Sequence, residues 1–266
     1  MSQHPLLNIA VRAARSAGDT IMRHADRIDT LTISEKSRND FVSEVDHQAE
    51  RAIIDIIHNA YPDHSILAEE SGSTPGSDHL WIIDPLDGTT NYLHQFPQYA
   101  VSIAVQIKGR LEHAVVYDPN SQELFTASRG SGAQLNGHRL RVTKKNSLHG
   151  ALLGTGFRVK SEYLDCYMNT LKALIPDTAG VRRPGSAALD LAYLAAGRID
   201  GFWEIGLRPW DMAGGVLLIQ EAGGMVGDFG GGEDFMKTGN IVAGNPKIFA
   251  QIVRTIQPHL VDGLKR

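Results

Sequence analysis

The chain has 266 residues, of which 42% are hydrophobic, and a formal net charge of −4 at pH 7. That length is enough for one large core or two smaller ones, and the acidic balance gives no basic footprint of the kind that nucleic-acid-binding proteins show. The single Cys166 excludes an internal disulfide and is most simply a helix core residue. Arg12 and Arg15 interrupt the apolar pattern at the N-terminus, which argues against a signal peptide or a membrane span. These features predict a soluble, cytoplasmic protein.

Two amphipathic helices are predicted early in the chain. Apolar residues recur at steps of three and four over 6–21 and again over 45–60. Ser43 is a suitable N-cap for the second helix, and Asp46 would lie in its first turn, where the helix dipole favours a carboxylate.

Strands follow in quick succession. A short strand at 65–68 ends at Glu69, and another at 81–83 should stop at Pro85, which lacks an N–H and has a fixed φ. The glycine-rich segment 129–137 is expected to be a hairpin loop and not a dinucleotide site, because it lacks the G-x-G-x-x-G spacing. An antiparallel meander is predicted from four alternating segments at 99–107, 111–117, 123–127 and 139–142.

From about residue 151 strands alternate with helices. The predicted strands are 151–155, 201–204 and 241–243, and the predicted helices are 162–174, the segment from the cap Ser186 to Gly197, the segment from Pro209 to Gly223, and 246–256. We therefore expect an α+β sub-domain over 1–150 that carries most metal ligands, and an α/β sub-domain over 151–266 that closes a cleft against it.

The stretch 81–90 (W-I-I-D-P-L-D-G-T-T) indicates a binding site. Asp84 and Asp87 stand where the strand should end, and Gly88 and Thr89 bring backbone N–H groups without bulk. Two carboxylates beside an amide nest can hold a divalent cation and a phosphate together. An Asp-Gly turn capped by aspartate side chains is the structural alternative for this stretch alone.

Four acids share a position at element ends. They are Glu69, Asp84, Asp87 and Asp211, the last in the first turn of the helix that opens at Pro209. Oxygen ligands without a cysteine or histidine cluster favour Mg²⁺ or Mn²⁺ over zinc. Two ions about 3.5–4 Å apart would use all four acids and could clamp both ends of an in-line phosphoryl displacement.

Several motifs together resemble the inositol monophosphatase family over nearly the whole chain. They are A-E-E-S-G at 68–72, W-I-I-D-P-L-D-G-T-T-N at 81–91, and R-P-W-D-M-A-G-G through E-A-G-G at 208–224. The resemblance implies a layered αβαβα sandwich, two or three Mg²⁺ ions per site, sensitivity to Li⁺ and a homodimer. Further motifs resemble the bacterial SuhB type within this family: N-I-A-V-R-A-A-R at 8–15, R-G-S-G-A-Q-L-N-G at 129–137, G-S-A-A-L-D-L-A-Y at 185–193, F-W-E-I-G-L-R-P-W-D at 202–211 and L-K-R at 264–266. That resemblance implies a further role beside RNA polymerase and the Nus factors in transcription antitermination.

The resemblance also implies roles for individual residues. Glu69, Asp84 and the carbonyl of Leu86 would hold one metal, and Asp84, Asp87 and Asp211 the second. Glu69 and Thr89 would orient the attacking water, with Asp46 hydrogen-bonded to the Thr89 hydroxyl. The N–H groups of Gly88 and Thr89 would cradle the phosphate of the substrate. The remaining substrate contacts would come from Asp87, Ala187 and Glu204 to polyol hydroxyls, and from Lys36 and Arg182 to phosphate charge. A surface salt bridge is the alternative for Arg182 and its neighbour Arg183.

Alternative substrates are fructose 1,6-bisphosphate and adenosine 3′,5′-bisphosphate, because the metal site recognises only the phosphate. The short segment 71–77 leaves little room for a nucleotide-binding insertion, and Glu204 suits a neutral polyol better than a second phosphate. A phosphate-binding P-loop, an H-E-x-x-H zinc motif and a G-x-S-x-G elbow do not occur in the sequence. The resemblance therefore predicts Mg²⁺-dependent hydrolysis of inositol monophosphate, with an added binding role in transcription. The alternative is a protein that acts mainly as a binding subunit of a transcription complex.

Overall fold

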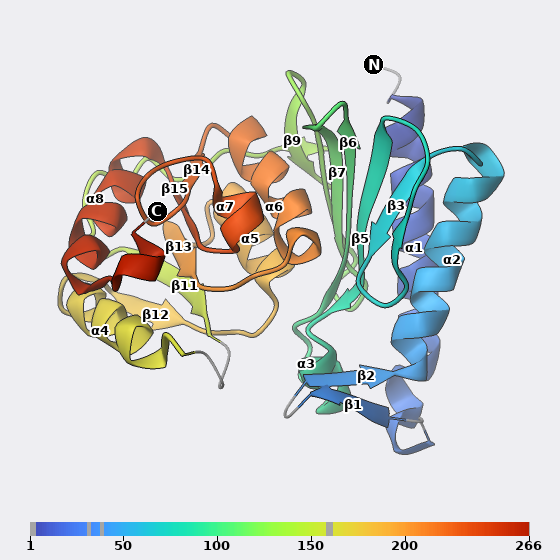
Figure 1. The fold of residues 1–266 in the computed structure, drawn as a ribbon, viewed down its shortest axis with the longest axis horizontal. Helices are drawn as coiled ribbons and strands as arrows, with labels where there is room; N and C mark the ends of the chain where they lie inside the picture. Colours follow the sequence, from blue (N-terminus) through green and yellow to red (C-terminus); the bar gives the residue numbers. More distant parts are fainter. Residues whose placement is uncertain (1–3, 31–32, 38–39, 158–161, 266) are drawn as a thin grey trace.

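Helices and sheets alternate in layers in the computed structural model, which describes residues 4–30, 33–37, 40–157 and 162–265. The helices are α1 (Pro5–His24), α2 (Glu44–Ala60), α3 (Thr89–Leu93), α4 (Leu164–Leu174), α5 (Ala187–Ala195), α6 (Pro209–Glu221), α7 (Phe235–Thr238) and α8 (Pro246–Ile256). Helices α1 and α2 cover the outer face of the larger sheet, α5 and α6 lie between the two large sheets, and α4 and α8 lie outside the smaller one (Figure 1). This order confirms the predicted αβαβα sandwich.

The larger sheet has the strand order β10-β9-β8-β7-β6-β5-β3-β4. Its strands are β3 (Ser65–Ala68), β4 (Gly72–Thr74), β5 (His79–Asp87), β6 (Ala100–Ile107), β7 (Arg110–Asp118), β8 (Glu123–Ser128), β9 (Gly132–Leu135) and β10 (His138–Arg139). From β5 to β10 each strand pairs antiparallel with the next in the sequence, which confirms the meander, whereas β5 pairs parallel with β3 on its other side. A separate hairpin pairs β1 (Ile33–Ser37) with β2 (Asp40–Ser43), just before α2.

The smaller sheet has the order β12-β11-β13-β15-β14. Its strands are β11 (Leu152–Gly156), β12 (Gly180–Arg182), β13 (Gly201–Glu204), β14 (Met225–Gly227) and β15 (Ile241–Gly244). Strand β11 runs parallel to β12 and β13, whereas β15 is antiparallel to both of its neighbours. The predicted strands and helices of this half are present, and β12 and β14 are added by the structure. Because α5 and α6 belong to the second half of the chain and pack on both sheets, the division at residue 150 stays a prediction.

The apolar core divides along the layers. One cluster joins α1 and α2 to the larger sheet and includes Ile53 and Trp81. A second fills the space around α5 and α6, and a third joins α4 and α8 to the smaller sheet around Trp203. Cys166 is buried in α4, as predicted. No helix in the described ranges has the length and apolar character needed to cross a membrane.

Strand β5 does not stop at Pro85, and this part of the prediction is wrong. Asp84 pairs with Ser102 and Asp87 pairs with Ala100, so three steps on β5 match two steps on β6. The extra residue forms a β-bulge, where proline is tolerated because the regular ladder is interrupted there. In a regular strand residues three apart face opposite sides of the sheet, but the bulge brings both aspartates to the same side.

The hairpin β9–β10 also departs from the prediction. The segment 129–137 was expected to be a loop, yet it contains β9, and the strand expected at 139–142 ends at Arg139. Asn136 and Gly137 both have positive φ and join Leu135 to His138 in a two-residue turn. An Asn-Gly pair between two short strands is a strong hairpin signal, and it decides this segment.

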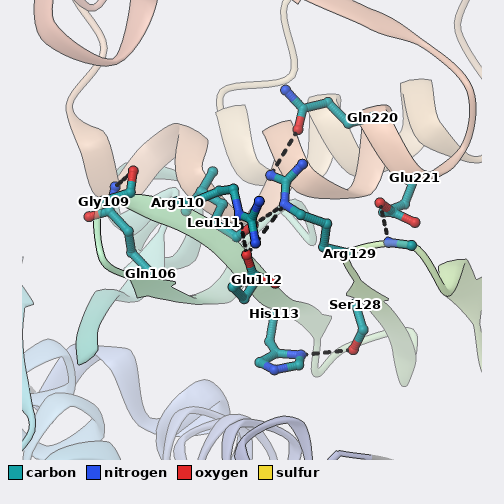
Figure 2. A network of polar contacts seen from close by, with 11 residues as sticks. Gln106, Gly109, Arg110, Leu111, Glu112, His113, Ser128, Arg129, Gln220 and Glu221 are labelled. Carbon is teal, nitrogen blue, oxygen red and sulfur yellow. Dashed lines mark hydrogen bonds and ion pairs between the residues drawn. The ribbon is translucent and has the colours of Figure 1, made fainter. Parts of the chain in front are cut away.

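Helix α6 runs from the cleft to a polar network at the far end of the larger sheet. At its last residue, the Glu221 carboxylate accepts hydrogen bonds from the N–H groups of Gly130 (2.9 Å) and Gly132 (2.8 Å). Figure 2 shows this end of the helix, where Arg129 reaches Gln220. Fastening one end of α6 in this way fixes the position of its first turn, which carries Asp211.

Candidate active site

A cavity of about 570 Å³ lies where strand ends from both sheets meet the N-terminal ends of α5 and α6. The predicted site residues that line it are Glu69, Asp84, Leu86, Asp87, Gly88, Thr89, Ala187, Glu204 and Asp211. Residues far apart in the sequence are therefore brought to one cavity. Its walls also contain Arg183, Ser186 and Asp190, none of which was predicted to belong to the site.

Asp84 is the most enclosed acid of the site, with 1% of its surface exposed. Burial raises its pKa well above the usual value, and the charges of Glu69, Asp87 and Asp211 raise it further, as does a hydrogen bond with Glu69. Burial, with a contribution from Glu69, also raises the pKa of Asp87 to about 6, although two hydrogen bonds oppose the shift. The four acids are thus close enough to repel one another.

The Asp87 carboxylate joins β5 to α5. Its Oδ2 accepts hydrogen bonds from the Ser186 hydroxyl (2.6 Å) and the Ala188 N–H (2.7 Å). Ser186 is the N-cap of α5, as predicted, but its contact with Asp87 was not foreseen. A negative charge at the N-terminus of a helix is stabilised by the unpaired N–H groups and the helix dipole.

Asp211 occupies the first turn of α6, as predicted. Its Oδ2 accepts a hydrogen bond from the Arg208 N–H at 2.7 Å. The carboxylate therefore stands at the N-terminal end of α6, where it lines the cavity.

Glu69 is held by contacts of its own turn. Its N–H donates to the Ile83 carbonyl at 3.1 Å, which ties the end of β3 to β5. The buried Glu50 of α2 accepts hydrogen bonds from the next two N–H groups, those of Glu70 (2.8 Å) and Ser71 (2.9 Å). Sequence reasoning missed Glu50, although an acid at this point of the helix breaks the apolar pattern of the buried face.

Thr89 and Asp46 are hydrogen-bonded. The Thr89 hydroxyl lies 2.8 Å from Asp46 Oδ1 and 3.1 Å from the Leu86 carbonyl, and its single proton serves one acceptor at a time. Burial raises the pKa of Asp46, while hydrogen bonds from Ser43 and Thr89 lower it. Asp46 stands behind Thr89 and does not line the cavity.

The two arginines of β12 and its end take different positions. Arg182 is exposed, donates to its neighbouring Val181 carbonyl and lies outside the cavity lining. Arg183 lines the cavity instead, with its guanidinium 5.0 Å from the centre of the Phe157 ring. The predicted contact of Arg182 with phosphate charge therefore does not agree with its position, and Arg183 is the arginine of this pair that borders the cavity. The side chain of Lys36 lies outside the described residues.

The acids of the cavity suit a hard divalent cation in kind. Their carboxylate oxygens are the ligand atoms that such a cation prefers, and Asp84 is almost fully buried. A cation between the acids would offset the repulsion among their negative charges. Within the described residues no three histidine, cysteine or acidic side chains form a complete ligand set. Protein N–H and O–H groups hold oxygens of Asp87 and Asp211 in this arrangement, so the division of ligands between ions stays a prediction.

An αβαβα sandwich with acids gathered beside a Gly-Thr amide pair is the combination expected of a phosphatase of the sugar-phosphatase fold class. The sequence model of the inositol monophosphatase family matches residues 2–260, and the chain belongs to this family. It is 57% identical to the Nus factor SuhB of Pseudomonas aeruginosa over 269 aligned residues, covering 98% of this chain and 99% of that protein.

Solved structures agree with this assignment. The extragenic suppressor protein SuhB of Bartonella henselae has a TM-score of 0.95 and 42% identity, covering 97% of this chain and all of the other. An inositol monophosphatase from Anabaena has a TM-score of 0.82 and 38% identity, covering 95% of each chain.

Proposed function

We propose that this chain is a Mg²⁺-dependent phosphatase that hydrolyses inositol monophosphate to inositol and phosphate. The observation that carries the proposal is the gathering of Glu69, Asp84, Asp87 and Asp211 in one cavity. Burial and then the negative charges of the other three acids raise the pKa of Asp84. Gly88 and Thr89 border the same cavity, and their N–H groups would bind the phosphate. Membership of the inositol monophosphatase family supports the same class of reaction.

The acids would hold two or three Mg²⁺ ions, with Mn²⁺ as a substitute. Glu69, Asp84 and the carbonyl of Leu86 would bind the first, and Asp84, Asp87 and Asp211 the second. Such ions, when bound, offset phosphate charge, lower the pKa of a coordinated water and stabilise the leaving oxygen. No covalent phosphoenzyme is then required, and we expect inversion at phosphorus.

The remaining groups orient the reactants. Glu69 and Thr89 border the cavity together and would position the attacking water. Asp46 would accept the proton of the Thr89 hydroxyl, which would make the Thr89 oxygen a better proton acceptor. Glu204 and Ala187, with Asp87, would contact the hydroxyl groups of the polyol. These carboxylates favour a neutral hydroxyl-rich substrate over fructose 1,6-bisphosphate or adenosine 3′,5′-bisphosphate, whose second phosphate they would repel.

A phosphate-release assay tests the proposal. Wild-type protein should release phosphate from inositol monophosphate faster than from either bisphosphate, only with Mg²⁺ or Mn²⁺, and Li⁺ should inhibit it. Asp55→Asn, a change at an exposed position on α2, is a matched control and should behave like wild type. Phosphate release that persists in excess chelator would contradict the metal-dependent mechanism, and preference for a bisphosphate would contradict the substrate.

A second role is favoured by one observation, the Nus factor name of the Pseudomonas relative at 57% identity. We infer that this chain also joins a cytoplasmic transcription complex with RNA polymerase and Nus factors, and that it forms a homodimer. An Asp87→Asn protein, inactive as a phosphatase, should still correct a ribosomal RNA defect in a deletion strain. Failure of that protein to do so, at normal expression and Tm, would refute a role independent of catalysis.

A further inference from the structure

Asp190 is a buried acid without a hydrogen-bond partner for its side chain among the described residues. It lies on α5 with 3% of its surface exposed, and it lines the cavity. Its carboxyl oxygens are not fully enclosed by protein atoms. The carboxyl group is therefore accessible from the cavity that the residue lines. A buried polar group with no partner costs free energy, which a ligand that pairs with it would recover.

Glu204 is the neighbouring acid, and the backbone of β11 makes room for both. Gly156 pairs with Glu204 in the parallel register, and a Cβ at Gly156 would overlap the Glu204 carboxylate. A Cβ at Gly154 would lie 3.9 Å from the carboxyl carbon of Asp190. Because residues two apart in a strand share a face, the two carboxyl groups stand side by side over the end of β11.

The charge environment agrees with this placement. Burial raises the pKa of Asp190 well above its usual value, followed by the charges of Glu204 and Asp87, and Arg183 acts in the opposite direction. A second anion would be repelled here. Hydroxyl groups suit the pair, because each one can both donate to a carboxylate and accept from a protonated carboxyl group.

We propose that Asp190 is a specificity-determining residue that, together with Glu204, binds adjacent hydroxyl groups of a polyol phosphate. This inference rests on the proposed phosphatase function and names the part of the cavity that reads the alcohol. The metal-binding acids and the Gly88–Thr89 amides act on the phosphate, whereas Asp190 acts on the group that leaves.

The test compares two substrates of the full-length enzyme with Mg²⁺. Asp190→Ala and Asp190→Asn are assayed with inositol monophosphate and with 4-nitrophenyl phosphate, whose aryl ring has no hydroxyl group to bind. The ratio of kcat/KM for the polyol to that for the aryl ester should fall about 10- to 100-fold, the size expected for a hydrogen bond to a charged group. The loss should appear mainly in KM, because the contact is the same before and during reaction.

Deoxy analogues of inositol monophosphate sharpen the comparison. Removing the hydroxyl that Asp190 binds should slow the wild-type enzyme about 10-fold or more and slow Asp190→Ala much less. A structural role would not couple one residue to one hydroxyl group in this way.

A second buried acid provides the control. Asp228 is 4% exposed, but its carboxylate accepts hydrogen bonds from the N–H groups of Gly230, Gly232 and Asp234, and it does not line the cavity. Asp228→Asn should lower Tm and leave the substrate ratio unchanged, whereas Asp190→Asn should keep or raise Tm and lower the ratio.

The outcomes separate the two proposals. Suppose that the wild-type enzyme cleaves both substrates. If the Asp190 variants then keep the wild-type ratio of kcat/KM values, or lose both activities equally, the role of Asp190 is overturned and the phosphatase function stands. A wild-type enzyme that cleaves neither substrate with Mg²⁺ would overturn the phosphatase function itself.

Discussion

Replacing Glu50 by glutamine should loosen the turn that carries Glu69. The Glu50 carboxylate is 3% exposed and accepts the N–H groups of Glu70 and Ser71 at 2.8 and 2.9 Å. A glutamine side chain has one acceptor oxygen and one NH₂ group, so it can satisfy only one of these donors and presents a donor to the other.

The expected size of the effect follows from these two bonds. A hydrogen bond to a charged group contributes about 1.5–3 kcal/mol, and glutamine removes one such bond and the charge on the second. Relief from burying a carboxylate offsets part of that loss. We therefore expect the free energy of unfolding of Glu50→Gln to fall by about 1–3 kcal/mol, and that of Glu50→Ala by more, because alanine leaves both donors unpaired and opens a cavity.

Urea unfolding followed by circular dichroism measures the stability, and phosphate release against Mg²⁺ concentration measures the site. Glu50→Gln should need more Mg²⁺ for half-maximal activity, because Glu69 is no longer held in place. Asp55→Asn, on the exposed face of the same helix, should change neither quantity. The reasoning is refuted if Glu50→Gln matches wild type in both assays.

Three further predictions follow from the site and the core. Asp84→Asn should lower kcat at least 100-fold at saturating Mg²⁺, since it removes charge that faces three other acids; activity within tenfold of wild type would count against its role. Gly156→Ala should displace the Glu204 carboxylate and raise KM for inositol monophosphate more than for 4-nitrophenyl phosphate, and equal effects on both would contradict it. Burial, and then the charge of His4, lower the pKa of His113 to about 4. The unfolded chain therefore takes up a proton that the fold resists, so stability should fall as pH drops from about 6.5 to about 4, by up to about 3 kcal/mol. The free energy of unfolding, measured by urea titration at several pH values, should fall more steeply with decreasing pH in wild type than in His113→Gln. Identical dependence on pH in the two proteins would exclude the effect.

Local chemistry explains why much of the fold could be predicted. The periodic apolar faces of α1 and α2, the caps Ser43 and Ser186 and the Pro209 helix start act within a few residues of themselves, so they are readable in one dimension. Glu69, Asp87 and Asp211 are also readable locally, because Glu69 follows the last residue of β3, Asp87 ends β5 and Asp211 lies in the first turn of α6. Short strands such as β12 and β14 have too few residues to show a period and depend on pairing with β11 and β15.

The unpredicted features depend on pairs that are distant in the sequence. The bulge at Pro85 is defined by the register between β5 and β6, and the contact of Ser186 with Asp87 joins residues 99 positions apart. Arg182 and Arg183 look equivalent in sequence, and only the path of the chain after β12 decides which one reaches the cavity.

The bulge has the larger consequence for function. A regular strand through Pro85 would face Asp84 and Asp87 to opposite sides of the sheet, and at most one of them could reach the cavity. The extra residue lets Asp84 stay buried beside Glu69 while Asp87 bonds to the start of α5. A single local irregularity therefore connects the larger sheet, the helix layer and the cavity. For the same reason, deleting one residue between these aspartates should abolish phosphate release while leaving the strand itself able to pair.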